Sequence, residues 1–172
     1  MTERIALIGM MGVGKTTVGR ALAIRLGWAY LDSDEQVRAA TGRSVKEISL
    51  EDGPETLHRF ENDALVAALQ SPTSAVIGVA GGALLADGTR VLLKGERHVV
   101  WLRASLETLA QRIGTMGDRP YFDGDPVGTI NELYEVRRPL YADVANFTID
   151  VDECTPEEIV ERILASVHPL GT

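Results

Sequence analysis

The chain has 172 residues, 45% of them apolar and 24% charged, with a formal net charge of −8. These values predict a single globular domain over 1–172, and the acidic balance argues against nucleic acid as a partner. No apolar run approaches the roughly 18 residues that span a bilayer, so we expect no membrane partner. Cys154 is the only cysteine, which suits a reducing compartment, and we expect a cytoplasmic monomer.

The first motif is Gly9–Thr16, which fits G-x-x-x-x-G-K-[ST], the phosphate-binding loop. An apolar run at 4–9 precedes it and predicts a buried strand, and a helical pattern over 15–26 follows it. Glycines let successive backbone N–H groups face one anion, and the helix N-terminus favours negative charge at the same place. Lys15 is then expected to reach the β- and γ-phosphates of ATP, and the Thr16 hydroxyl to hold Mg²⁺.

The second predicted strand, at about 28–32, ends in two carboxylates that are two residues apart. Asp32 could hold a water molecule bound to Mg²⁺. Asp34 could accept a hydrogen bond from an acceptor hydroxyl and help to remove its proton. Because a helical pattern follows over 34–41, capping of that helix is the alternative interpretation of Asp34.

Alternating strands and helices continue to the end of the chain. Further strands are expected at 75–80, 98–102 and 146–151, and further helices at 54–70, 105–114, 127–143 and 156–167. The alternation predicts an α/β fold, a parallel sheet with helices on both faces, whose ligands lie beyond the carboxyl ends of the strands. Gly81 and Gly82 follow the third strand and would let a ligand approach the backbone closely.

Residues 114–126 interrupt this alternation with three glycines, two prolines and no periodicity. A plain surface loop is one interpretation. The length of the segment and its central Arg119 favour the other, a mobile lid over the phosphates.

Together these motifs resemble those of the shikimate kinases, a family of small phosphate-loop kinases. The resemblance covers nearly the whole chain and rests on Gly9–Thr17, 31–34, 41–44, Asp52-Gly53 with Arg59 and Glu61, Gly81-Gly82, Arg119-Pro120 and 137–141. It implies a P-loop kinase with a five-stranded parallel sheet, a lid at about 114–126 and a substrate-binding region at about 34–62. It also implies transfer of the γ-phosphate of ATP to the 3-hydroxyl of shikimate.

The resemblance also assigns roles to single residues. Lys15, Asp34 and Arg119 would be catalytic, and Thr16 and Asp32 would hold Mg²⁺. The nucleotide would be bound by Gly12, Val13, Gly14, Lys15, Thr16, Thr17, Arg112 and Pro156, the last two on either side of the adenine. The small hydroxylated substrate would contact Asp34, His58, Glu61, Gly81, Gly82 and Arg137. Arg137 would pair with a carboxylate through its two-pronged guanidinium group.

Several pocket positions depart from the family pattern. His58 stands where the family has an arginine that also holds the substrate carboxylate, and Ser49 and Leu57 stand where it usually has phenylalanines. Ala80 replaces the first of three glycines. An arginine is always charged, whereas a histidine is mostly neutral near pH 7 unless a carboxylate stabilises its charge. Losing a desolvated charged partner of a carboxylate costs roughly 2–5 kcal/mol.

These departures leave the acceptor open. Arg137 favours a shikimate kinase with a weaker or rebuilt carboxylate site. His58, Ser49 and Leu57 favour a kinase of another small polyol or cyclitol that lacks a carboxylate. A nucleotide-binding module that no longer transfers phosphate would not need Asp32, Asp34 or Arg119. A nucleotide kinase would need more basic residues around the acceptor phosphate.

Overall fold

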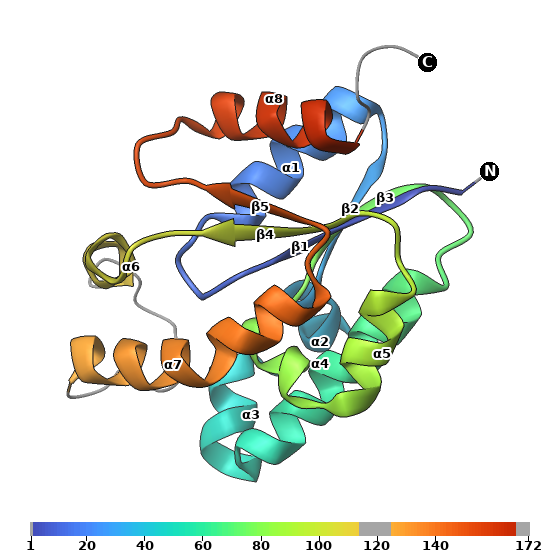
Figure 1. The fold of residues 1–172 in the computed structure, drawn as a ribbon. Coiled ribbons are helices and arrows are strands. Elements are labelled where there is room, and N and C mark those ends of the chain that lie inside the picture. The colour runs from blue at the N-terminus through green and yellow to red at the C-terminus, as the bar shows by residue number, and fades with distance from the viewer. Residues whose placement is uncertain (1, 114–124, 168–172) are drawn as a thin grey trace.

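The computed structural model describes residues 2–113 and 125–167. Five parallel strands form one sheet in the order β2-β3-β1-β4-β5, which confirms the predicted α/β class (Figure 1). The strands are β1 Arg4–Ile8, β2 Ala29–Asp32, β3 Ala75–Gly78, β4 Val99–Arg103 and β5 Phe147–Asp150. The central strands are buried on both faces, as expected of a parallel sheet that helices cover.

Six helices lie where the periodicity predicts them. They are α1 Lys15–Leu26, α2 Ser33–Thr41, α4 Pro54–Leu69, α6 Leu106–Ile113, α7 Pro126–Val144 and α8 Pro156–Val167. The prediction missed three further elements, α3 Val45–Asp52, the 3₁₀ helix η1 Gly81–Leu85 and α5 Asp87–Lys94. In the described ranges, no helix is both long and apolar enough to traverse a bilayer.

The helices form a layer on each face of the sheet. α1 and α8 cover one face and contact each other, while α4, α5 and α7 lie on the other face (Figure 1). The chain leaves β1 toward the first layer and leaves β3 toward the second. Neighbouring strands whose connections leave on opposite faces open a crevice at their carboxyl ends, which is where ligands bind in such sheets.

The buried apolar residues of the described ranges form two separate clusters. The large one joins the sheet to the helices on both faces. The small one lies between α2, α3 and α4 and consists of Val37, Ile48, Leu57 and Ala64, with Val45 and Phe60 packed against them. The expected substrate-binding region at about 34–62 is therefore built around an apolar centre of its own.

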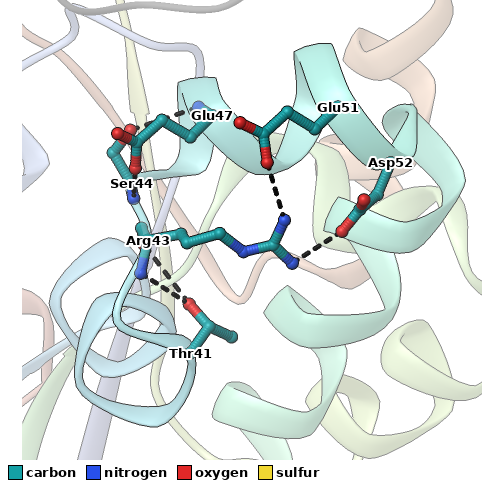
Figure 2. A network of polar contacts seen from close by, with 6 residues as sticks. All are labelled: Thr41, Arg43, Ser44, Glu47, Glu51 and Asp52. Carbon is teal, nitrogen blue, oxygen red and sulfur yellow. Dashed lines mark hydrogen bonds and ion pairs between the residues drawn. The ribbon is translucent and has the colours of Figure 1, made fainter.

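Polar contacts at both ends hold α3 in place. At its start, Ser44 and Glu47 form a reciprocal capping box, and the Ser44 backbone N–H lowers the pKa of the Glu47 carboxyl. Figure 2 shows how Arg43 reaches from the preceding loop to the far end of the helix. It donates to Glu51 over 3.1 Å and to Asp52 over 2.6 Å. These contacts hold α3 in place within the expected substrate-binding region.

Candidate active site

A cavity of about 290 Å³ lies at the carboxyl edge of the sheet. Segments that follow β1, β2 and β3 line it, together with parts of α3, α4 and α7. The lining residues are Met11, Gly12, Gly14–Thr17, Asp32–Asp34, Val45, Leu57, His58, Glu61, Gly78–Gly82 and Arg137. Most residues expected to bind phosphate, metal or acceptor thus surround one space, although the sequence places them up to 125 positions apart, from Gly12 to Arg137.

The phosphate-binding loop has the backbone geometry that its glycines permit. Gly9, Gly12 and Gly14 have positive φ angles of 146°, 80° and 103°. A Cβ added at Gly9 would lie 2.5 Å from the Leu102 carbonyl oxygen, so the loop passes tightly against β4. Gly14 is the N-cap of α1, and no side chain among the described residues caps that helix. The first backbone N–H groups of α1 therefore receive no hydrogen bond from a capping side chain of these residues. A helix N-terminus of this kind suits an anion.

The Lys15 ammonium group lies across this loop. Its Nζ donates to the carbonyl oxygens of Gly9, over 2.6 Å, and of Met10, over 3.1 Å. These bonds keep the charge at the mouth of the loop, beside the N-terminus of α1. Positive charge from the side chain and from the helix dipole is thereby concentrated at one place.

The Asp32 carboxylate is held by donors on both of its oxygens. Oδ1 accepts from the backbone N–H groups of Asp34 and Glu35, over 2.9 and 3.2 Å, so Asp32 is the N-cap of α2. Oδ2 accepts from Thr16 Oγ1 over 3.1 Å and from the Tyr30 hydroxyl over 2.9 Å. Thr16 and Asp32, the two residues expected at Mg²⁺, are thus in direct contact.

Tyr30 is a site residue that the sequence interpretation missed. Its side chain fills the space above two glycines, because a Cβ at Gly19 would overlap a ring carbon and a Cβ at Gly78 would overlap the hydroxyl oxygen. Burial, followed by the charge of Asp32, raises the pKa of the Tyr30 hydroxyl, so it remains a donor to Asp32. The contact between Tyr30 and Asp32 could have been predicted, because residues two apart on a strand point to the same face.

Ser33 is a second residue that the interpretation left without a role. Its buried hydroxyl donates to the Gly78 carbonyl over 3.0 Å and accepts from the Ala80 N–H over 3.3 Å. It therefore ties the start of α2 to the turn that leads into Gly81 and Gly82. Ala80 has a φ of −59°, so the position does not need the glycine that the family has there.

Asp34 lines the cavity from the first turn of α2. The alternative interpretation, that Asp34 caps this helix, is wrong because the Asp32 side chain makes the capping bonds. The Asp34 carboxylate is therefore not used as the cap. It lines the same cavity as Lys15 of the phosphate loop and Arg137 of the inner wall.

Arg137 forms that inner wall. Its side chain is 2% exposed, and its Nε and Nη1 atoms have no hydrogen-bond partner within the described residues. It packs closely over Gly81, where an added Cβ would lie 3.0 Å from Nη1 and 3.1 Å from the Tyr141 hydroxyl. Burial raises the pKa of Tyr141 to about 12, and the nearby Arg137 charge opposes that rise. A buried guanidinium is costly unless its donors are satisfied and its charge is compensated, so this position suits an anionic ligand.

His58 contacts Glu61 and Gly82 at the same end of the cavity. Its Nδ1 is 2.9 Å from Glu61 Oε2, one helical turn along α4, and Glu61 is buried. Arg59 is exposed, lies over the Phe60 ring and does not line the cavity, so it does not replace the family arginine. Leu57 lines the cavity, whereas Ser49 is not among the described residues around it.

A second cavity, of about 300 Å³, adjoins the outer side of the phosphate loop. It is lined by Gly12–Gly14, Thr17, Val18, Arg112, Cys154, Pro156 and Ile159. Arg112 donates to the carbonyl oxygens of Gly12, over 3.3 Å, and of Val13, over 2.9 Å. The two residues expected beside the adenine, Arg112 and Pro156, therefore share a space next to the loop. Arg119 and residues 114–124 of the expected lid lie outside the described residues.

Sequence comparison identifies the family. The profile described as shikimate kinase matches residues 11–168. The chain belongs to the shikimate kinase family. It is 41% identical to the shikimate kinase of Streptomyces coelicolor over 164 residues, which are 95% of either chain. It is 39% identical to the shikimate kinase of Thermobifida fusca, again over 95% or more of both chains.

Solved structures lead to the same family. A shikimate kinase from Acinetobacter baumannii in complex with shikimate has a TM-score of 0.93 and 31% identity, over 99% of this chain and 97% of that one. A shikimate kinase from Aquifex aeolicus has a TM-score of 0.81 and 29% identity, over 95% of each chain. A gluconokinase from Sinorhizobium meliloti, at 21% identity and a TM-score of 0.70, shares the fold.

Family membership confirms the predicted fold as that of a P-loop kinase and the predicted activity as that of an ATP-dependent phosphotransferase. The shikimate kinase family acts on a small hydroxylated metabolite, so that class of partner is confirmed as well.

Proposed function

We propose that this protein transfers the γ-phosphate of ATP to a hydroxyl of shikimate, with Mg²⁺ as its metal cofactor. The observation that carries the choice of acceptor is the buried Arg137. Two nitrogens of this desolvated guanidinium have no hydrogen-bond partner in the part of the chain that the structure describes, which is costly unless an anion compensates the charge. A carboxylate matches its planar, two-pronged geometry, and an uncharged polyol does not. The relative that was solved with shikimate supports this acceptor.

The metal assignment rests on the chemistry of the donors. Thr16 offers a hydroxyl oxygen and Asp32 a carboxylate oxygen, 3.1 Å apart and next to the phosphate loop. Mg²⁺ prefers oxygen ligands and binds through few protein groups plus phosphates and water, so this small set fits it. Thr16 and Asp32 would hold the ion, whose chemistry there would be to neutralise negative charge on the phosphates. Tyr30 would keep the Asp32 carboxylate oriented toward that position.

The remaining residues supply positioning and charge. We infer that the loop amides and Lys15 bind the phosphates and that Arg112 and Pro156 enclose the adenine. Asp34 would orient the acceptor hydroxyl for direct in-line transfer and receive its proton, and Arg119 would stabilise the transferred group. Gly81 and Gly82 would let the acceptor lie against the backbone, between Arg137 and His58.

The sequence leaves two other functions open. A polyol or cyclitol without a carboxylate is the second candidate, because His58 replaces a permanently charged residue; Arg137 argues against it. A module that only binds nucleotide has no use for Asp34 in the acceptor cavity. The cytoplasmic monomer, the absence of nucleic-acid and membrane partners, and the single domain over 1–172 stay predictions.

The test is ATP turnover against shikimate, quinate, gluconate and uncharged cyclitols. We expect shikimate to be phosphorylated most efficiently. Arg137→Met should raise the KM for shikimate at least about 30-fold, because losing a desolvated charged partner of a carboxylate costs roughly 2–5 kcal/mol of binding free energy. Arg138→Met is the matched control, because Arg138 is an exposed neighbour, 55% accessible. The proposal would be refuted if an uncharged cyclitol were the preferred substrate and its turnover were unaffected by Arg137→Met. Unchanged turnover in Lys15→Met would refute kinase activity at this site altogether.

A further inference from the structure

The His58–Glu61 pair fixes the orientation of the His58 ring. Nδ1 lies 2.9 Å from Glu61 Oε2, and a Cβ added at Gly82 would come within 2.6 Å of Nδ1 and 3.2 Å of that carboxylate oxygen. The edge of the ring that carries Nδ1 is therefore pressed between Glu61 and the glycine backbone. Within the described residues the ring makes only this hydrogen bond, so Nε2 is the nitrogen left for a ligand in the cavity.

This contact decides what a neutral His58 can do. An ionised carboxylate only accepts hydrogen bonds, so Nδ1 must carry the proton that it donates to Glu61. In the neutral ring Nε2 is then an acceptor, whose lone pair would face the oxygen atoms of an acceptor carboxylate. Protonation turns Nε2 into a second donor and gives the ring a positive charge.

We propose that His58 binds the acceptor carboxylate as an imidazolium ion held by Glu61, so that the protein takes up a proton when the acceptor binds. This inference rests on the proposed function, since it needs an acceptor with a carboxylate. The proton comes from solvent and sits on Nε2. No covalent bond forms or breaks.

The charges at this end of the cavity support proton uptake. In the free protein with neutral His58, Glu61 and Arg137 carry one negative and one positive charge. An entering carboxylate makes this set net negative, and protonation of His58 restores neutrality. The other charged groups that line the cavity are Asp32 and Asp34 at the start of α2 and Lys15 on α1. From α3 and η1 the cavity lining has Val45, Gly81 and Gly82, which have no charge.

The consequence is a pH-dependent KM. With an arginine at this position the acceptor site would stay charged throughout the neutral range, whereas a histidine loses its charge there. We expect the KM for shikimate to rise about tenfold between roughly pH 6.5 and pH 8, with the KM for ATP changing little. The acceptor carboxylate itself stays ionised over this range, since such groups titrate near pH 4.

The experiment measures KM and kcat for shikimate across this pH range in the wild type, His58→Gln and His58→Arg. Glutamine offers an uncharged N–H donor and arginine a permanent charge, so both variants should have a flat KM, low in His58→Arg and high in His58→Gln. Calorimetry in two buffers of different ionisation enthalpy should detect proton uptake when shikimate binds to the wild type alone. With only three histidines in the chain, the ring of His58 can also be followed by NMR.

The results separate this inference from the proposed function. Turnover of shikimate with a KM that is flat in pH, or binding without proton uptake, overturns the role of His58 and leaves the proposed acceptor intact. Failure to bind or phosphorylate shikimate at any pH overturns both. A pH-dependent KM that persists in His58→Gln would place the titrating group elsewhere and also refute the inference.

Discussion

Replacing Tyr30 with phenylalanine should weaken the use of Mg²⁺ while leaving the ring in place. The change removes only the hydroxyl that donates to Asp32 Oδ2 over 2.9 Å. The ring still fills the space over Gly19, and the contact of the hydroxyl oxygen with Gly78 is lost. Asp32 Oδ2 then keeps a single donor, Thr16, which is also an expected metal residue.

The magnitude follows from these contacts. A hydrogen bond to a charged group contributes about 1.5–3 kcal/mol, and the partial exposure of this cluster favours the lower end. If that energy orients Asp32 toward the metal, the half-saturating concentration of free Mg²⁺ should rise about tenfold, which corresponds to 1.4 kcal/mol. The melting temperature should fall by only a few degrees, roughly 2–4 °C per kcal/mol for a chain of this size.

The assay is a titration of kinase activity with free Mg²⁺ at saturating ATP and acceptor. It is paired with calorimetry of ATP binding with and without the metal. Tyr134→Phe is the matched control, because Tyr134 does not line the acceptor cavity and loses the same hydroxyl group. An unchanged Mg²⁺ dependence in Tyr30→Phe, or an equal change in Tyr134→Phe, would show that Tyr30 does not position Asp32.

Three further outcomes are expected. The free energy of unfolding should fall as pH rises from about 10 toward 12, because the Tyr141 pKa is about 12 in the folded state and near 10 in the unfolded chain. Measured by urea unfolding, the loss should approach about 1.4 kcal/mol per pH unit. It should be smaller in Tyr141→Phe, which has no hydroxyl to ionise. Gly9→Ala should abolish ATP binding measured by calorimetry, since its Cβ would lie 2.5 Å from a backbone oxygen of β4; wild-type affinity would contradict the tight loop described above. Asp34→Asn should lower kcat about 100-fold with a smaller change in KM, measured at saturating acceptor, and normal turnover would exclude its proposed role.

The elements that the sequence predicted well are those with a long local pattern. α1 and α8 have regular apolar spacing, and their bounds agree with the prediction. α3 was not predicted because it buries a single residue, Ile48, and so has no apolar periodicity. The Ser44–Glu47 spacing of a capping box did indicate the start of this helix. α5 begins with Asp87-Gly88, a pair that is typical of turns.

The same distinction applies to the site. Lys15, Thr16 and Asp32 belong to short motifs whose function depends on neighbours in the chain, so the sequence is sufficient to propose them. The burial of Arg137 beside Gly81 depends on the order of strands in the sheet, which brings the segment after β3 and α7 to the same cavity. The contact between His58 and Glu61 could have been predicted from the sequence, because residues three apart on a helix are neighbours.

The small apolar cluster between α2, α3 and α4 has an evolutionary consequence. It shares none of its buried residues with the large cluster beneath the phosphate loop. Substitutions on its inner side, such as leucine at position 57, can be accommodated by neighbours on α2, α3 and α4. Acceptor preference in this scaffold can thus change through these helices without repacking the core beneath the phosphate loop.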